Sequence, residues 1–146
     1  MSKRIYFAGP LFCTAERDYN TAVRDALAAA GFDVFLPQES SLNIDKGCMD
    51  DPVKKTEMGT KIFGKDLDEV RNADILVINL DGRVPDEGAC VELGYAYALG
   101  KPCFAIKTDV RTAEFGVDNL MTSGAVGNRI AGSVDELVRM ISSCSD

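Results

Sequence analysis

The sequence feature that most restricts the fold is a nearly all-apolar run of seven residues, Asp74-Ile75-Leu76-Val77-Ile78-Asn79-Leu80. Such a run is typical of a central β-strand that is covered on both faces, as in parallel sheets. A second apolar, β-prone run, Arg4–Gly9, stops at Gly9-Pro10 and predicts another buried strand followed by a turn. We therefore expect an α/β protein built on a parallel sheet.

Strand and helix patterns alternate along the chain. Besides the two runs above, strands are predicted at 33–36, at 102–106 and, briefly, near Ala125-Val126. Helices are predicted at 14–30, 53–72, 88–99 and 134–143. Alternation with short connections predicts one domain over residues 1–146: a doubly wound, flavodoxin- or Rossmann-like parallel sheet of about five strands flanked by helices. Sheets of this kind bind ligands beyond the carboxyl ends of their strands.

The helix predicted at 53–72 follows a polar loop that runs from Pro37 to about Met49. Gly59 and Gly64 are points at which this helix could break. Its apolar residues predict a face that packs on the core, made of Ile62, Phe63, Leu67 and Val70.

Charge and residue content exclude several classes of partner. The formal net charge is −7 and no Lys/Arg-rich run offsets it, which argues against binding to polymeric DNA or RNA. No apolar stretch approaches the roughly 18 residues that span a bilayer. The N-terminal run is too short and too interrupted for a signal peptide, so we expect a cytoplasmic protein that binds no membrane.

Residue content also limits the chemistry. The five cysteines are odd in number and lack CxxC spacing, which predicts neither disulfides nor a zinc site. The chain has no histidine, so Ser-His-Asp and Cys-His nucleophiles and the usual histidine metal sites are excluded. Neither GxGxxG nor GxxxxGK[ST] occurs, and we expect no cofactor and no metal. Acid–base chemistry must fall to carboxylates, Tyr, Lys or Cys.

The predicted fold gathers polar groups that follow its strands into a carboxylate-rich cleft. These groups are Tyr6, Gln38, Asp81, Asp86, Glu92 and Asp109.

Glu92 is the most informative of these residues. It lies about a turn into an otherwise apolar helix, so its carboxylate should be partly buried, and the helix dipole would favour its ionised form by roughly 0.3–1 kcal/mol. Gly88 and Gly94 leave room for a ligand. On spacing alone the alternative stays open that Asp86 is simply the helix N-cap and Glu92 a charge that stabilises the first turns.

Four motifs occur together: Tyr6-Phe7-Ala8-Gly9-Pro10, then Asp66, then Asp86-x-Gly-x-x-x-Glu92-Leu-Gly-Tyr-Ala, then Asn119-Leu-Met. In this order and spacing, over most of its length, the chain resembles the nucleoside 2-deoxyribosyltransferase family. The resemblance implies an enzyme of nucleoside salvage that exchanges the nucleobase of a 2'-deoxyribonucleoside for another free base. It also implies a covalent deoxyribosyl-enzyme and net retention at the anomeric carbon.

The resemblance also implies roles for individual residues. Glu92 matches the family's nucleophile, and Tyr6 matches a tyrosine whose hydroxyl holds and orients that glutamate. Asp66 matches the aspartate that contacts the nucleobase and can protonate the departing ring nitrogen. Asp86 matches a residue that binds the sugar hydroxyls. Asn119 matches one that a neighbouring subunit supplies to the 5'-hydroxyl, which implies a homo-oligomer, at least a dimer.

Three further residues complete the expected substrate site. Gln38 is suitably placed for a contact with the base, while Gly9 and Gly88 lie inside two of the motifs. Asp109 and Arg111 are expected to form a structural ion pair rather than to act in catalysis.

Two alternatives to a transferase come from the same chemistry or the same fold. In a deoxynucleoside or deoxynucleoside 5'-monophosphate N-glycosidase, water replaces the second base. Its phosphate form needs donors where this chain has Pro10-Leu11-Phe12-Cys13 and the anionic Asp86, so a free 5'-hydroxyl fits better. A response-regulator receiver with Asp81 and Lys107 would need an acidic pair where the chain has Gly9-Pro10.

A third alternative is a module that senses a nucleoside or nucleotide without turning it over. Such a module would keep the binding pocket but would not catalyse a reaction. Substitution of Glu92 by alanine would distinguish the two, because a binding module should lose little of its function and an enzyme nearly all of it.

Overall fold

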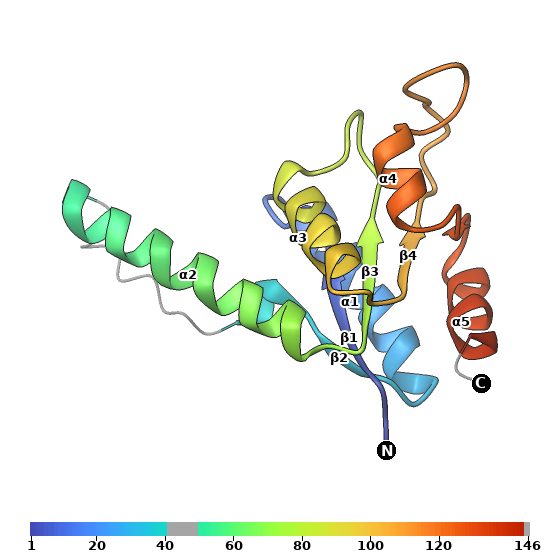
Figure 1. The fold of residues 1–146 in the computed structure, drawn as a ribbon, viewed down its shortest axis with the longest axis horizontal. Helices are drawn as coiled ribbons and strands as arrows, with labels where there is room; N and C mark the ends of the chain where they lie inside the picture. The colour runs from blue at the N-terminus through green and yellow to red at the C-terminus, as the bar shows by residue number, and fades with distance from the viewer. Residues whose placement is uncertain (41–49, 145–146) are drawn as a thin grey trace.

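The computed structural model describes residues 1–40 and 50–144, in which a parallel sheet lies between helices (Figure 1). Its strands are β1 (Arg4–Ala8), β2 (Asp33–Phe35), β3 (Ile75–Asn79), β4 (Cys103–Ile106) and β5 (Ile130–Ala131). Its α-helices are α1 (Thr14–Ala29), α2 (Pro52–Asn72), α3 (Glu87–Ala98), α4 (Leu120–Ala125) and α5 (Val134–Ser143), and η1 (Pro37–Glu39) is a 3₁₀ turn. Residues 41–49 of the predicted 37–49 loop lie outside the described residues.

The sheet has the order β2-β1-β3-β4-β5, and each neighbouring pair is parallel. This confirms the predicted doubly wound parallel sheet. In this order the winding reverses between β1 and β3, which leaves a crevice at the carboxyl ends of those two strands.

Alternate residues of each strand face opposite helical layers. Tyr6 and Ala8 of β1 pack in the core beneath α2 and α3, whereas Ile5 and Phe7 pack in the core beneath α1 and α5. All five residues of β3 are buried, as its apolar run predicted for a central strand.

The short strand predicted near Ala125-Val126 is wrong. Ala125 ends α4 and Val126 is its C-cap, while the fifth strand is Ile130–Ala131 and pairs with Ala105 and Ile106. Val126 is apolar because it packs into the core beneath α3, and burial of a helix end gives the same short apolar signal as an edge strand.

The predicted core face of α2 is only partly right. The helix is unbroken at both glycines, but only Val70 is fully buried, and Phe63 is 59% exposed. Figure 1 shows the reason, because the first half of α2 extends beyond the sheet and has no described element to pack against. Among the residues described, no helix is both long and apolar enough to cross a membrane.

Candidate active site

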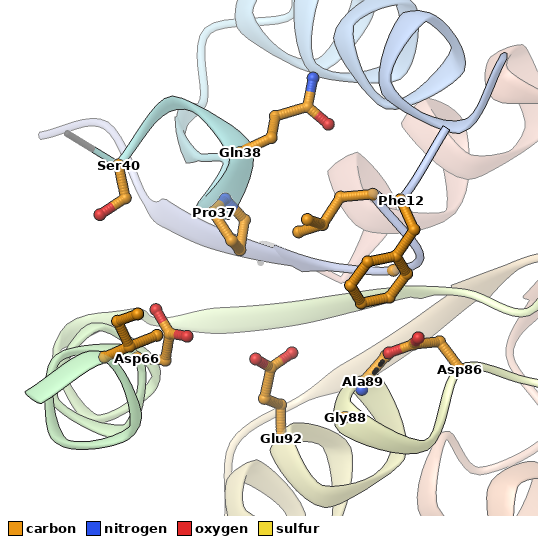
Figure 2. Close-up of a pocket in the computed structure, with 12 residues that line it drawn as sticks. Phe12, Pro37, Gln38, Ser40, Asp66, Asp86, Gly88, Ala89 and Glu92 are labelled. Atoms are coloured by element: carbon orange, nitrogen blue, oxygen red, sulfur yellow. Dashed lines mark hydrogen bonds between the residues drawn. The ribbon is translucent and has the colours of Figure 1, made fainter. Parts of the chain in front are cut away.

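A cavity of about 500 Å³ opens at the carboxyl ends of β1 and β3, between two unlike walls (Figure 2). The first, which we term the carboxylate wall, consists of Asp66 from α2 with Asp86 and Glu92 from α3 and its N-cap. The second, the loop wall, comes from the segments that follow β1 and β2. It consists of Leu11, Phe12, Pro37, Gln38 and Ser40.

The centre of the carboxylate wall is a hydrogen-bonded pair. The Tyr6 hydroxyl donates to Glu92 Oε1 at 2.7 Å, and Tyr6 itself is completely buried on β1, an interior strand of the sheet. Burial and the neighbouring Glu92 carboxylate raise the pKa of Tyr6 far above its ordinary value, so the hydroxyl always carries the proton that it donates. Glu92 Oε2 has no hydrogen-bond partner among the described residues and is therefore available to contact a ligand.

Burial raises the pKa of Glu92 to about 7, and the carboxylates of Asp66 and Asp86 raise it too, while the Tyr6 hydrogen bond lowers it. Burial therefore outweighs the helix dipole, which was expected to favour the ionised form. α3 begins at Glu87, so Glu92 lies beyond the first turn, where the effect of the dipole has decayed. Near neutral pH the carboxyl is poised between its two forms.

Asp66 lies on the inner face of α2 and lines the cavity opposite the loop wall. Partial burial raises the pKa of its carboxyl and Glu69 adds to this, against the lowering effect of Lys65. A carboxyl with a raised pKa holds its proton closer to neutral pH, as a general acid must.

Asp86 serves the N-terminus of α3 and the cavity together. Its Oδ2 accepts from the Ala89 amide at 2.8 Å, which is the N-cap bond that spacing alone allowed. Gly88 has little space beside it, since a Cβ there would lie 3.3 Å from Asp86 Oδ2. The side chain of Asp86 still lines the cavity, so the cap and a sugar contact do not exclude one another.

Gln38 lines the cavity, but its amide is already engaged by α1. Its Nε2 donates to the Arg17 carbonyl at 2.9 Å and to Thr21 Oγ1 at 3.1 Å, and its Oε1 accepts from Asn20 Nδ2 at 3.1 Å. Figure 2 shows the amide turned away from Glu92. A direct contact between this amide and a base stays a prediction.

The remaining predicted polar residues lie outside this cavity. Asn119 is the N-cap of α4, where its Oδ1 accepts from the Met121 and Thr122 amides. Asp81 accepts from the Thr108 amide and from the Asp109 amide and so ties two loops together. Asp109 and Arg111 form the predicted ion pair.

Sequence reasoning missed most of the loop wall. Phe12 is 76% exposed and lies at the cavity mouth, and Pro37 lines the cavity beside Gln38. A signal existed, because both residues follow strands whose carboxyl ends were expected to bind a ligand. Among the described residues that line the cavity there is no Lys or Arg. Within the described residues no group of three or more Cys, Asp or Glu side chains is arranged to hold a metal ion.

One comparison with known proteins identifies the family of this chain. A family model described as nucleoside 2-deoxyribosyltransferase matches residues 5–127. No curated protein gives a significant match.

Three solved structures cover nearly the whole chain. A conserved protein from Enterococcus faecalis V583 is 29% identical with a TM-score of 0.77, and 99% of each chain is covered. The 2-deoxyribosyltransferase from Bacillus psychrosaccharolyticus is 25% identical with a TM-score of 0.73, covering 92% of this chain and 90% of that one. The 2-deoxyribosyltransferase from Leishmania mexicana shares the fold at 24% identity, with a TM-score of 0.73 and 99% coverage of each chain.

Proposed function

The chain belongs to the nucleoside 2-deoxyribosyltransferase family, and on this premise we propose that it exchanges the nucleobase of a 2'-deoxyribonucleoside through a covalent adduct on Glu92. The observation that carries the proposal is the Tyr6–Glu92 pair. It holds one carboxylate oxygen and leaves the other facing a cavity into which a second carboxyl, Asp66, also projects.

The first half of the reaction breaks the N-glycosidic bond. Glu92 Oε2 attacks the anomeric carbon while the bond to the base breaks, and the bonding electrons leave with the base. Asp66 delivers a proton to the departing ring nitrogen, so the base leaves neutral. The product is a deoxyribosyl ester of Glu92, with the Tyr6 hydroxyl still bound to Oε1.

The second half reverses these steps with another base. A ring nitrogen of the incoming base attacks the anomeric carbon, the ester bond breaks and the carboxylate of Glu92 is regenerated, while Asp66 takes up the proton. Two inversions give net retention at the anomeric carbon. If water attacks instead, the same adduct gives hydrolysis, which is the alternative activity for this site.

The charge of the cavity favours a nucleoside over a nucleotide. Among the described residues, three carboxyl groups line the cavity and no cationic side chain does, so a 5'-phosphate would meet repulsion from these groups without a compensating donor from them. The loop wall offers the apolar surfaces of Phe12 and Pro37 to the flat face of a base. These features support a 2'-deoxyribonucleoside with a free 5'-hydroxyl as the substrate.

Incubation with 2'-deoxyinosine and free adenine tests the proposal. We expect 2'-deoxyadenosine and hypoxanthine to appear together in equal amounts, measured by chromatography. Release of hypoxanthine alone would make the protein a hydrolase. Failure to convert any deoxynucleoside and base pair would favour a module that binds without turnover.

We further propose that the enzyme is a homo-oligomer in which Asn119 completes the cavity of a neighbouring copy. Asn119 does not line the cavity of its own chain, and next to it Met121 is 82% exposed and Leu120 55% exposed. Leu120 and Met121 line a groove between α3 and α4 whose described lining residues are all uncharged, and Tyr97, in the same groove, is 62% exposed. An apolar surface of this kind is typical of subunit interfaces.

A mixing experiment tests this arrangement. Asn119→Asp keeps an N-cap acceptor for α4 but loses the amide donor, and Glu92→Gln keeps Asn119 but loses the nucleophile. Each variant alone should be inactive, while subunits mixed under exchanging conditions should regain up to roughly a quarter of wild-type activity, because some neighbours then combine one intact Glu92 with one intact Asn119. No recovery in an oligomer whose subunits have been shown to mix would mean that Asn119 does not act between subunits.

A further inference from the structure

A chain of buried amide side chains runs beneath the loop wall. Asn20 of α1 is 2% exposed, and its Nδ2 donates to the Pro10 carbonyl at 2.8 Å and to Gln38 Oε1 at 3.1 Å. Its Oδ1 accepts from Asn79 Nδ2 at 3.5 Å, and Asn79, the last residue of β3, is also 2% exposed. One side chain thus joins the segment after β1, the η1 turn after β2 and the end of β3.

A buried amide at this point requires a physical reason. Burial of an amide costs free energy unless its donors and acceptors are paired, and an apolar side chain would fill the same space without that demand. Here the amide pairs with groups from two separate loops, so its hydrogen bonds fix their positions relative to α1. Gln38 extends the same network through Arg17 and Thr21.

The packing at Gly9 shows how closely this region is fitted. A Cβ at Gly9 would lie 3.0 Å from Asn79 Cβ and 3.6 Å from Asn20 Oδ1, so the backbone after β1 rests directly on the two buried amides. Leu11 and Phe12 follow within three residues, and their positions depend on that support.

The carboxylate wall is held in a different way. Glu92 is held by Tyr6, and Asp86 by its cap on α3, and no hydrogen bond of Asn20 in the described structure reaches either residue. The two walls therefore have separate supports, one in the core beneath α3 and one on α1.

From this separation we infer that Asn20 is a positioning residue that holds the loop wall as a binding surface for the substrate without acting in the chemistry. The inference rests on the proposed function for what the surface binds. The amide network itself is independent of that function.

Asn20→Asp tests the inference, because it keeps the size of the side chain and replaces the amide donor with an acceptor. The Pro10 carbonyl and Gln38 Oε1 would then face a carboxylate oxygen, and we expect the loop wall to move. KM for the nucleoside and for the free base should rise about tenfold or more, while kcat at saturation changes less than about threefold. The dependence of the rate on pH, which Glu92 sets, should keep its midpoint.

Val23→Ala is the matched control, since Val23 is fully buried on the same helix but takes no part in the amide network. It should lower the melting temperature while leaving KM unchanged. Asn20→Ser, a milder change, serves if the aspartate variant does not fold. A fall in kcat at unchanged KM, or a rise in KM equal to that of Val23→Ala, would overturn the inference.

Hydrogen exchange gives a readout that needs no activity. The amides of Phe12 and Ser40 should exchange faster in Asn20→Asp than in wild type or Val23→Ala, while the amides of α3 stay unchanged. Unchanged exchange at both positions would overturn the inference. If the wild-type protein transfers no base at all, the proposed function fails, and hydrogen exchange alone then decides the role of Asn20.

Discussion

Replacement of Glu92 by glutamine is expected to lower the rate of base exchange by about 10⁴-fold or more while making the folded protein more stable at neutral pH. The loss follows because an amide oxygen cannot form the glycosyl ester. The gain follows because glutamine still accepts the Tyr6 hydrogen bond but carries no charge into a site where burial raises the pKa of the carboxyl to about 7. A substitution that lowers activity but raises stability indicates that the original residue serves function and not folding.

The gain in stability should depend on pH in a defined way. The pKa of Glu92 is raised from 4.5 in an unfolded chain to about 7, so the folded state binds this proton more tightly. The stability that this group confers is complete below pH 4.5 and is lost as pH rises to about 7. The advantage of the glutamine variant should therefore grow across that window to roughly 3 kcal/mol at most.

Thermal melting at pH 4.5 and pH 8, together with the exchange assay, measures both effects. Glu87→Gln is the control, because Glu87 lies on the same helix and is exposed. It should leave the rate and the pH dependence of stability nearly unchanged. An exchange rate for Glu92→Gln within tenfold of wild type would eliminate the covalent mechanism.

Asp66→Asn is expected to lower the exchange rate by roughly 10²–10⁴-fold for substrates with ordinary bases. The amide cannot protonate the departing nitrogen, so the base must leave as an anion. The deficit should shrink for 2'-deoxyribosides of more acidic bases, which leave readily without a proton. A series of donors with graded base acidity, assayed with one acceptor base, measures this dependence.

A second signature separates Asp66 from a merely structural residue. The Asp66 carboxylate raises the pKa of Glu92, so its removal should shift the acidic limb of the pH–rate profile to lower pH. Asp68→Asn is the matched control, since Asp68 lies two residues away, is 65% exposed and pairs with Arg71. An equal deficit for every leaving group would show that Asp66 does not act as the acid.

The sequence was sufficient for the first four strands of the sheet because these strands carry strong, local signals. The all-apolar run of β3 required cover on both faces, and the structure has it. Phe63 on α2 was misassigned because helical periodicity does not reveal where the sheet beneath a helix ends. Val126 was misassigned because two consecutive apolar residues, Ala125 and Val126, fit a buried helix end and a short strand equally well.

In the site, too, the residues could be predicted from local sequence motifs, whereas properties that depend on the packed fold could not. Glu92 and Tyr6 were predicted from motifs, and the structure brings them within 2.7 Å of each other from positions 86 residues apart. The pKa of Glu92 could not be predicted, because it depends on burial that only the packed fold creates. The role of Gln38 was equally hidden, since the partners of its amide all lie on α1.

The complete burial of Tyr6 has a consequence for how this protein can evolve. Its ring stacks on Phe35 with centroids 5.4 Å apart, so the residue that holds the proposed nucleophile, Glu92, is also part of the hydrophobic core. A substitution of Tyr6 that alters its hydrogen bond to Glu92 must therefore also preserve the packing of the core. Phe12 and Pro37 of the loop wall are not part of this core. If the proposed function holds, substitutions at these two positions could change the preference among bases without changing the proposed reaction.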